Sequence, residues 1–480
     1  MQFRHIGFGW DSPVNLVKGE QVYNFVRTLE KNYLFDNSYS SGLHKSLYFF
    51  EIPGYENGHP PAYSFIVFII GNFFSMLFGF KYYFFHLANI IFTAFFLYFF
   101  QKFTYQFTKS LTISIVSSLV LISIPHFFVY SIVNIKDLPV ALFTFFGIYS
   151  LLLFKPKDLL IKIIVVQTFV LLALYSKFTA IYLFPVILYL SYLDKNLYKF
   201  VRGQFWKVAL LVSSYTVLFT CVFWPHLIFN FSYELERLKF VYMTLPENSV
   251  NDHFFVFFFV EKLPLVFLIL FGGSILYGLA FSREKKLLAF WFLPIFLYLI
   301  FVNRYYEAFR QFLFIFVFSA FSLALALNKI LARHVKNFFV TVFLILSLIS
   351  YSMYYFLMPS YKKIFFSSVF FSEGSKDIWG LSLPEALDYV EKKYAPTRIY
   401  FSPLAFLLEY YEIREKGWEI IYQPEYSNIW VTTTKVNPYE EERLLRENYY
   451  IKDSDFKHGE DVLEVWVKRD YYESVVLGRF

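Results

Sequence analysis

Long apolar runs recur along most of this chain, and they limit its possible folds more than any other feature. Of its 480 residues, 57% are hydrophobic and 17% are charged, whereas soluble domains carry about 25% charged residues. A helix of about 17–25 apolar residues crosses the hydrocarbon core of a bilayer. We therefore predict an integral membrane protein. The runs lie near 84–101, 111–130, 138–154, 160–176, 178–193, 207–224, 263–281, 287–302, 311–328 and 337–357.

Lys and Arg gather in every second connection between these runs. The basic connections lie near 102–109, 155–162, 195–207, 283–286 and 329–336. Cytoplasmic loops carry an excess of basic residues, so these connections are predicted to be cytoplasmic and the alternate ones to be outside. The unbroken alternation predicts ten spans over residues 84–357. It also accounts for the net charge of +7 without nucleic acid as a partner.

Parity places another apolar stretch, residues 62–80, differently. If 102–110 is inside, the span 84–101 begins outside, and the polar segment 1–61 is outside as well. The stretch 62–80 then starts and ends on the outer side, which favours a helix at the membrane interface. The alternative is a true span with a tight turn at Lys81. No apolar run precedes this first loop of residues 1–83 to carry it across the bilayer. We therefore expect that a signal peptide or a first helix is missing.

The composition changes at residue 358. Residues 358–480 alternate predicted helices and strands, so we expect a small α/β domain outside the membrane. It serves either in substrate recognition or as a lid, or it is a structural appendage. The predicted helices lie near 383–394, 403–413 and 437–448, and the strands near 397–401, 418–422, 428–433 and 462–468. The single cysteine, Cys221, excludes an intramolecular disulfide and cysteine-based metal motifs.

Polar residues of the predicted outer side are candidate site residues. Asp11 stands in the first loop, where it is either a solvated carboxylate or a general base. His59 precedes Pro60 and Pro61, a rigid turn well placed to start the helix 62–80. Asp137 begins a span, where it can cap the helix and complement its dipole, a role that is compatible with catalysis.

Basic residues on the outer side are exceptions to the charge rule. They are Lys136, Lys177, Arg304 and Arg310, with Tyr305 beside the third. Snorkelling explains any one of them. Together with carboxylates on the same side, they fit a site for a lipid phosphate.

In this order, the residues resemble bacterial members of glycosyltransferase family 39. The matching elements are Asp11, the His59-Pro60-Pro61 sequence, the N-x-K-D-x-P sequence from Asn134 to Pro139, the Lys177 turn, the R-x-F-L sequence from Arg310 to Leu313, and Trp379 to Ser382. The family has the GT-C fold and includes protein O-mannosyltransferases and aminoarabinose transferases. The resemblance thus implies an α-helical polytopic membrane protein in the bacterial plasma (inner) membrane.

The resemblance also implies a reaction. A sugar would pass, with inversion, from a polyprenyl-monophosphate donor to a protein, glycolipid or polysaccharide acceptor on the outer face. Asp11 would be the base and Asp137 would position or stabilise the acceptor, while His59, Lys136, Lys177, Arg304, Tyr305 and Arg310 would bind donor phosphate or substrate. Asn134 belongs to the same N-x-K-D-x-P sequence as Lys136 and Asp137 and is a further possible site residue.

The chain departs from the family at two positions. Ser12 stands where relatives often have Glu, and Asn15 where some have His, which leaves Glu20 as a substitute acid. A divalent metal is implied for some relatives. His226, Asp252 and His253 are its candidate ligands here or ordinary loop residues, and no tight ligand cluster is visible.

Two other classes of protein compete with this interpretation. A transporter or lipid flippase would place charges within the spans and show inverted repeats, and we find almost no such charges and no obvious repeat. A catalytically inactive scaffold of the same fold is the other alternative. The sugar and the acceptor stay open.

Overall fold

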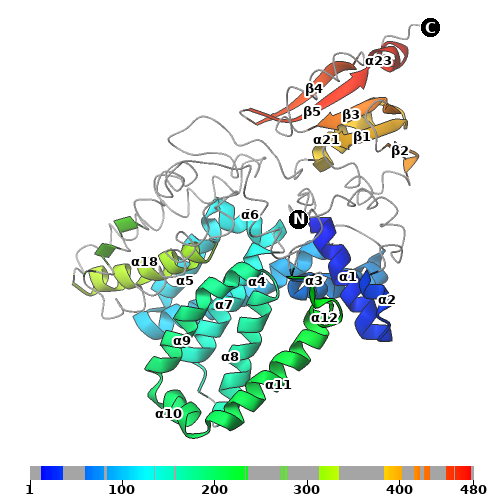
Figure 1. Cartoon of the computed structure of the whole chain (residues 1–480). Coiled ribbons are helices and arrows are strands. Elements are labelled where there is room, and N and C mark those ends of the chain that lie inside the picture. Colours follow the sequence, from blue (N-terminus) through cyan, green and yellow to red (C-terminus); the bar gives the residue numbers. More distant parts are fainter. Residues whose placement is uncertain are drawn as a thin grey trace.

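The computed structural model of the chain is mostly helical, with a small sheet near the C-terminus (Figure 1). It describes residues 12–35, 60–79, 84–133, 136–155, 158–232, 234–235, 313–333, 383–402, 416–421, 426–432, 450–458 and 460–476, with isolated helical residues between 272 and 280.

Helices make up almost all of the described chain before residue 334. They are α1 (Ser12–Thr28), α2 (Asn32–Phe35), α3 (Ala62–Phe78), α4 (Phe84–Thr108), α5 (Leu111–Ser123), α6 (Pro125–Val133), α7 (Asp137–Leu152), α8 (Leu159–Leu174), the 3₁₀-helix Phe178–Leu183, α9 (Phe184–Leu193), α10 (Lys195–Gly203), α11 (Phe205–Phe223), α12 (Pro225–Phe229) and α18 (Leu313–Arg333).

The structure corrects three predicted helix boundaries. The run 111–130 is two helices, because Pro125 has no amide hydrogen and disfavours helical geometry at the residue before it. Ile124 accordingly has an extended ψ of 118°. The run 178–193 begins with a 3₁₀ segment before α9, and α4 continues past 101 to Thr108. The other predicted spans, near 263–281, 287–302 and 337–357, lie wholly or mostly outside the described residues.

Phenylalanine fills the contacts among α4, α7 and α18. Phe96, Phe100 and Phe103 lie on one stripe of α4 and are fully buried. The Phe103 ring centroid is 5.5 Å from that of Phe145 on α7 and 5.1 Å from that of Phe321 on α18. Such ring pairs contribute about 0.5–1.5 kcal/mol each beyond burial.

Two of the described helices, α4 and α11, are long and apolar enough to cross a membrane, judged by length and composition. Shorter apolar helices accompany them: α3, α5, α7, α8, the segment 178–193 and the apolar part of α18. Many of their large apolar side chains are exposed, including Leu210 and Leu218 on α11 and Met76 on α3.

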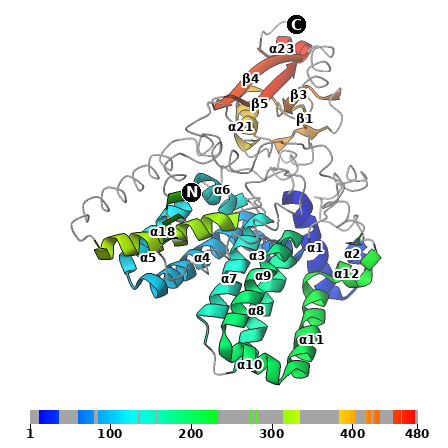
Figure 2. The same ribbon diagram turned by 60° about the vertical axis from the view of Figure 1, so that its left-hand side comes forward.

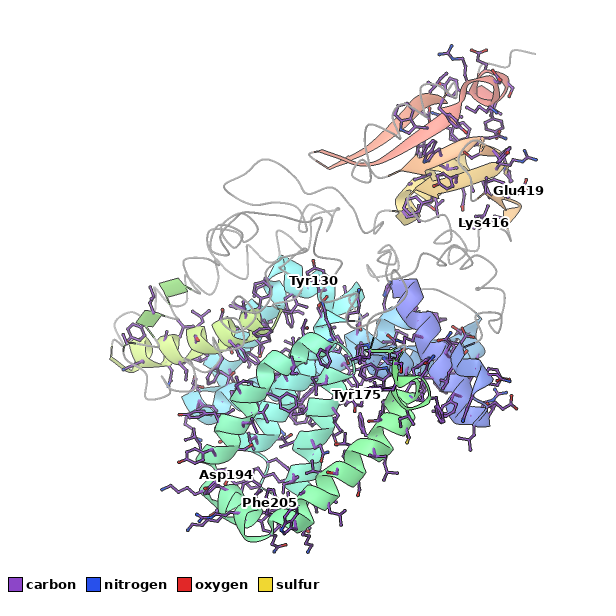
Figure 3. The ribbon with its side chains drawn as sticks, viewed as in Figure 1. Tyr130, Tyr175, Asp194, Phe205, Lys416 and Glu419 are labelled. Atoms are coloured by element: carbon purple, nitrogen blue, oxygen red, sulfur yellow. The ribbon has the colours of Figure 1, made fainter. Side chains whose placement is uncertain are left out.

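The connections between α7 and α11 fall at two opposite ends of the helices. Figure 3 shows Asp194 and Phe205, which flank α10, at the end far from the sheet, and Tyr175 nearer the sheet. The helix α10 therefore lies at one end, and the turn after α8 faces the other.

The C-terminal strands form one sheet of order β2-β1-β3-β5-β4. Its elements are α21 (Leu383–Lys393), β1 (Arg398–Ser402), β2 (Glu419–Ile420), β3 (Ile429–Thr432), β4 (Tyr450–His458), β5 (Glu460–Lys468) and α23 (Arg469–Val476). β1 is parallel to β2 and β3, and β5 is antiparallel to β3 and β4. Figure 1 shows the sheet, with α21 and α23 beside it, apart from the helices before residue 334 and on the side opposite α10.

The strand β4 and the helix α23 are absent from the sequence prediction. β4 is rich in charged residues, which is typical of a protected edge strand and hides the alternating pattern. Its pairing with β5 includes register shifts, between Lys452 and Ser454 and between Phe456 and Lys457. The predicted helices 403–413 and 437–448 lie outside the described residues.

Candidate functional site

Two elements of the predicted site meet at the start of α3. The Ala62 amide donates a hydrogen bond of 2.8 Å to the Tyr175 carbonyl, in the turn that carries Lys177. Pro60 and Pro61 before it are buried. A helix N-terminus has amide groups without helical partners, and here the turn after α8 supplies an acceptor for one of them. The prolines are thereby held beside the Lys177 turn, more than 110 positions further along the chain.

Asp137 and Lys177 form a buried ion pair. Only 3% of Asp137 and 4% of Lys177 is exposed. Removing one partner of such a pair leaves an uncompensated buried charge, so the pair fixes the start of α7 against the turn after α8. Lys136, directly before α7, is buried as well. The structure thus gathers Lys136, Asp137 and Lys177.

The helix start corrects one role considered for Asp137. The residue preceding α7 is Lys136, and Asp137 is the first helical residue. Its carboxylate therefore lies in the first turn, where it complements the positive end of the helix dipole, rather than in the capping position.

A second buried ion pair joins α1 to the segment after α12. Lys18 Nζ lies 3.3 Å from Glu234 Oε2, and each residue is 2% exposed. Trp224 Nε1 donates a hydrogen bond of 3.1 Å to the same carboxylate oxygen. Glu234 therefore accepts from two groups and ties α1 to the end of α11.

Tyr175 links the two ion pairs. Its ring lies edge-on to the Trp224 ring at 5.3 Å, and its hydroxyl is 2.7 Å from Thr220 Oγ1 on α11. Its carbonyl accepts from Ala62, and Lys177 follows it by two residues. One continuous set of contacts thus runs from Asp137 through the turn after α8 to Glu234 and α1.

The first loop docks on α12 through α1 and α2. The His226 ring donates a hydrogen bond of 3.1 Å from Nε2 to the Leu34 carbonyl, and the Phe25 and Phe229 rings are 5.4 Å apart. Both views show α1, α2 and α12 side by side (Figure 2). The helices α1 and α2 of the first loop therefore lie against the short helix that follows α11.

A close approach fixes α1 against α3. A Cβ added to Gly19 would lie 2.3 Å from the Ser64 carbonyl oxygen, well inside van der Waals contact. Tyr63 next to it is fully buried and donates a hydrogen bond of 2.8 Å to Asn89 on α4. Asn89 in turn donates to the Ile132 carbonyl at 2.7 Å. These contacts hold α1, α3, α4 and α6 together.

Several predicted site residues lie outside the described residues. They are Asp11, His59, Asn134, Arg304, Tyr305 and Arg310. Asp11 is bonded to Ser12, the first residue of α1, and Glu20 is half-buried on the same helix. Of the described residues, Ser12 begins α1 and Pro60 lies two positions before α3, and these two helices pack on each other.

The described residues show no group of three or more His, Cys, Asp or Glu side chains that could hold a metal ion. Of the three candidate ligands, His226 is buried and hydrogen-bonded to Leu34, while Asp252 and His253 lie outside the described residues.

The sequence did not single out Lys18, Tyr175, Trp224 or Glu234. One signal for Lys18 was available, because it shares an i, i+4, i+7 stripe with Val22 and Phe25, which are buried. A cation in an apolar stripe indicates a buried partner. Glu234 carried no comparable signal, since its role depends on a contact 216 positions away.

A comparable ion pair lies at the opposite end of the helices. Lys162 Nζ is 2.6 Å from Asp194 Oδ2. Partial burial alone would raise the pKa of the Asp194 carboxyl, but hydrogen bonds from Lys162 and from the Leu197 and Asn196 amides outweigh it and lower that pKa. Asp194 also caps α10 through these amides.

No family model matches this sequence, and no curated protein matches it significantly.

Proposed function

We propose that this protein is a polytopic membrane glycosyltransferase of the GT-C type. It would transfer a sugar from a polyprenyl-monophosphate donor to an acceptor on the outer face of a bacterial plasma membrane. One observation carries the proposal. The helix that follows His59-Pro60-Pro61 contacts the Lys177 turn through the Ala62–Tyr175 hydrogen bond. The helix that begins within the N-x-K-D-x-P sequence contacts the same turn through the Asp137–Lys177 ion pair. Three of the elements that carry the resemblance thus meet at one end of the helices.

Exposed apolar helix surfaces support a membrane location. Leu210 is 70% exposed and Leu218 66% exposed on α11, and Met76 is 77% exposed on α3. Contiguous apolar surface is costly in water and favourable in lipid. The two-ended arrangement of the connections between α7 and α11 supports several crossings rather than one.

Transfer with inversion needs a base for the acceptor and compensation for the charge of the leaving phosphate. We assign the base to Asp11. Its carboxylate would take the acceptor proton as the acceptor oxygen bonds to the anomeric carbon. The bond from that carbon to the phosphate oxygen breaks, and its electron pair leaves with the polyprenyl phosphate.

The ion pair refines the roles of Asp137 and Lys177. Each neutralises most of the charge of the other, so neither is well suited to act alone as base or as phosphate ligand. We assign them a positioning role, which holds Lys136 and the start of α3 at the site. Lys136, Arg304 and Arg310, with Tyr305, are then the groups assigned to the donor phosphate.

The test is donor turnover in membranes that contain the full-length chain. Radiolabelled polyprenyl-phosphate hexoses and pentoses are supplied, and release of the label to acceptors of the host membrane is measured. Asp11→Asn should lower transfer by about 100-fold or more, the typical contribution of a general base. Asp137→Asn should also lower it.

Asp194→Asn is the matched control, because it removes a carboxylate paired with lysine at the opposite end. It should leave transfer per folded protein unchanged. Full activity in both Asp11→Asn and Asp137→Asn would refute the mechanism. Movement of intact donor across the bilayer without release of label would favour the flippase instead, and neither activity would favour a scaffold.

A further inference from the structure

The helix α10 presents a basic face at the end of the helices far from the sheet. Lys195, Lys199 and Arg202 recur at i, i+4 and i+7, so they share one side of the helix, and all three are exposed. None of them makes an ion pair with the residues that the structure describes. Lys207, in the first turn of α11, is exposed as well.

The opposite side of α10 is anchored. Leu197 is buried, and Asp194 caps the helix through the Asn196 and Leu197 amides. The Asp194 carboxylate is itself paired with Lys162 on α8. The only acid between 192 and 207 is therefore engaged, and Asp158, the acid before α8, caps that helix by accepting from the Leu160 amide. The net charge of this surface is positive.

Exposed aromatic rings border the basic face. Trp206 is 82% exposed and Tyr192 63% exposed. Tyr192 contacts Tyr198 at 5.4 Å between ring centroids, and Phe205 contacts Trp206 at 5.2 Å. Aromatic rings of this kind are enriched at the headgroup level of bilayers. A soluble anionic partner would give no reason for exposed aromatic rings at the adjoining ends of two apolar helices, α9 and α11.

We propose that α10 is an interfacial helix that binds anionic phospholipid headgroups, with Lys195, Lys199 and Arg202 contacting their phosphates. The inference rests on the membrane location proposed above and is independent of sugar transfer. A basic face with flanking aromatic residues is the pattern of helices that lie in the interface.

The test uses the full chain in detergent micelles titrated with acyl-brominated phosphatidylglycerol, and acyl-brominated phosphatidylcholine in parallel. Quenching of Trp206 is obtained as the difference between the wild type and Trp206→Phe, which removes one of eight tryptophans. The wild type should be quenched at lower concentrations of the anionic lipid. Each basic residue adds about five-fold in affinity for anionic lipid. The Lys195→Gln/Lys199→Gln/Arg202→Gln variant should therefore need roughly 100-fold more phosphatidylglycerol for the same quenching.

A matched variant removes three charges elsewhere. Lys392→Gln/Arg398→Gln/Lys416→Gln alters exposed ion pairs around the sheet and should keep the preference. Equal quenching of the wild type by both lipids would overturn the proposal, as would absence of quenching by either lipid. A helical circular dichroism spectrum equal to that of the wild type shows that a variant has folded. Sugar transfer, measured separately, is expected to persist in the triple variant of α10.

Discussion

The Ala62 amide and the Tyr175 carbonyl are joined by a hydrogen bond of 2.8 Å that crosses 113 positions of the chain. It places the proline-led start of α3 against the turn in which Lys177 pairs with Asp137. The Tyr175 ring also packs edge-to-face against the Trp224 ring, and the Trp224 indole donates a hydrogen bond to Glu234. The candidate site is therefore built around a turn, and the stability of that turn can be tested.

The buried pair Asp137–Lys177 should show strong coupling. Lys177→Met alone leaves a buried carboxylate uncompensated and should cost about 3–5 kcal/mol, whereas Lys177→Met with Asp137→Leu should cost much less. Thermal unfolding in detergent measures both. If the double variant is as unstable as the sum of the two single variants, the pair is not coupled.

Removal of the Glu234 carboxylate should destabilise the fold more than removal of the Lys18 ammonium. Glu234→Ala removes an acceptor from both Lys18 and Trp224, whereas Lys18→Met and Trp224→Phe each remove one donor. Loss of a buried hydrogen-bond partner costs about 1–3 kcal/mol, and more for a charged group. A double-mutant cycle with Lys18→Met and Glu234→Ala gives the coupling energy. Additive effects would contradict a direct pair.

A methyl group at Gly19 should push α1 away from α3, because its Cβ would meet the Ser64 carbonyl at 2.3 Å. Overpacking of this kind costs about 1–3 kcal/mol or more. Hydrogen exchange of α1 amides should accelerate in Gly19→Ala. Gly203→Ala is the control, because nothing beyond its chain neighbours and its own helix backbone lies within 4 Å of the added Cβ. Unchanged exchange in Gly19→Ala would show that α1 and α3 do not approach this closely.

Acid should weaken the anchor of α10. The pKa of Asp194 is lowered in the folded protein from its usual value of 3.8. At a pH above that usual pKa, the ionised carboxylate therefore stabilises the fold. That contribution is lost as the pH falls through the lower, folded value. The carboxylate is 25% exposed, so the effect is modest. The stability of Asp194→Asn should change less with pH in this range, measured by urea unfolding. Identical pH profiles for the variant and the wild type would refute the assignment.

The sequence determined much of the local structure. The described apolar runs are helices, from α3 to α11 and in α18, and Pro125 divides one run because it lacks an amide hydrogen. The predicted strands 397–401, 418–422, 428–433 and 462–468 are present as β1, β2, β3 and β5. These features depend on neighbouring residues, and so a local pattern is sufficient to predict them.

Only the tertiary structure decided which polar residues meet. Asp137 and Lys177 were both candidates, but their pairing depends on how α7 packs against the turn after α8. Glu234 was not a candidate at all, because its importance comes from Lys18, which lies 216 positions earlier in the chain. A buried charge is stable only beside its partner, and which residue is that partner is set by packing between helices rather than by local sequence.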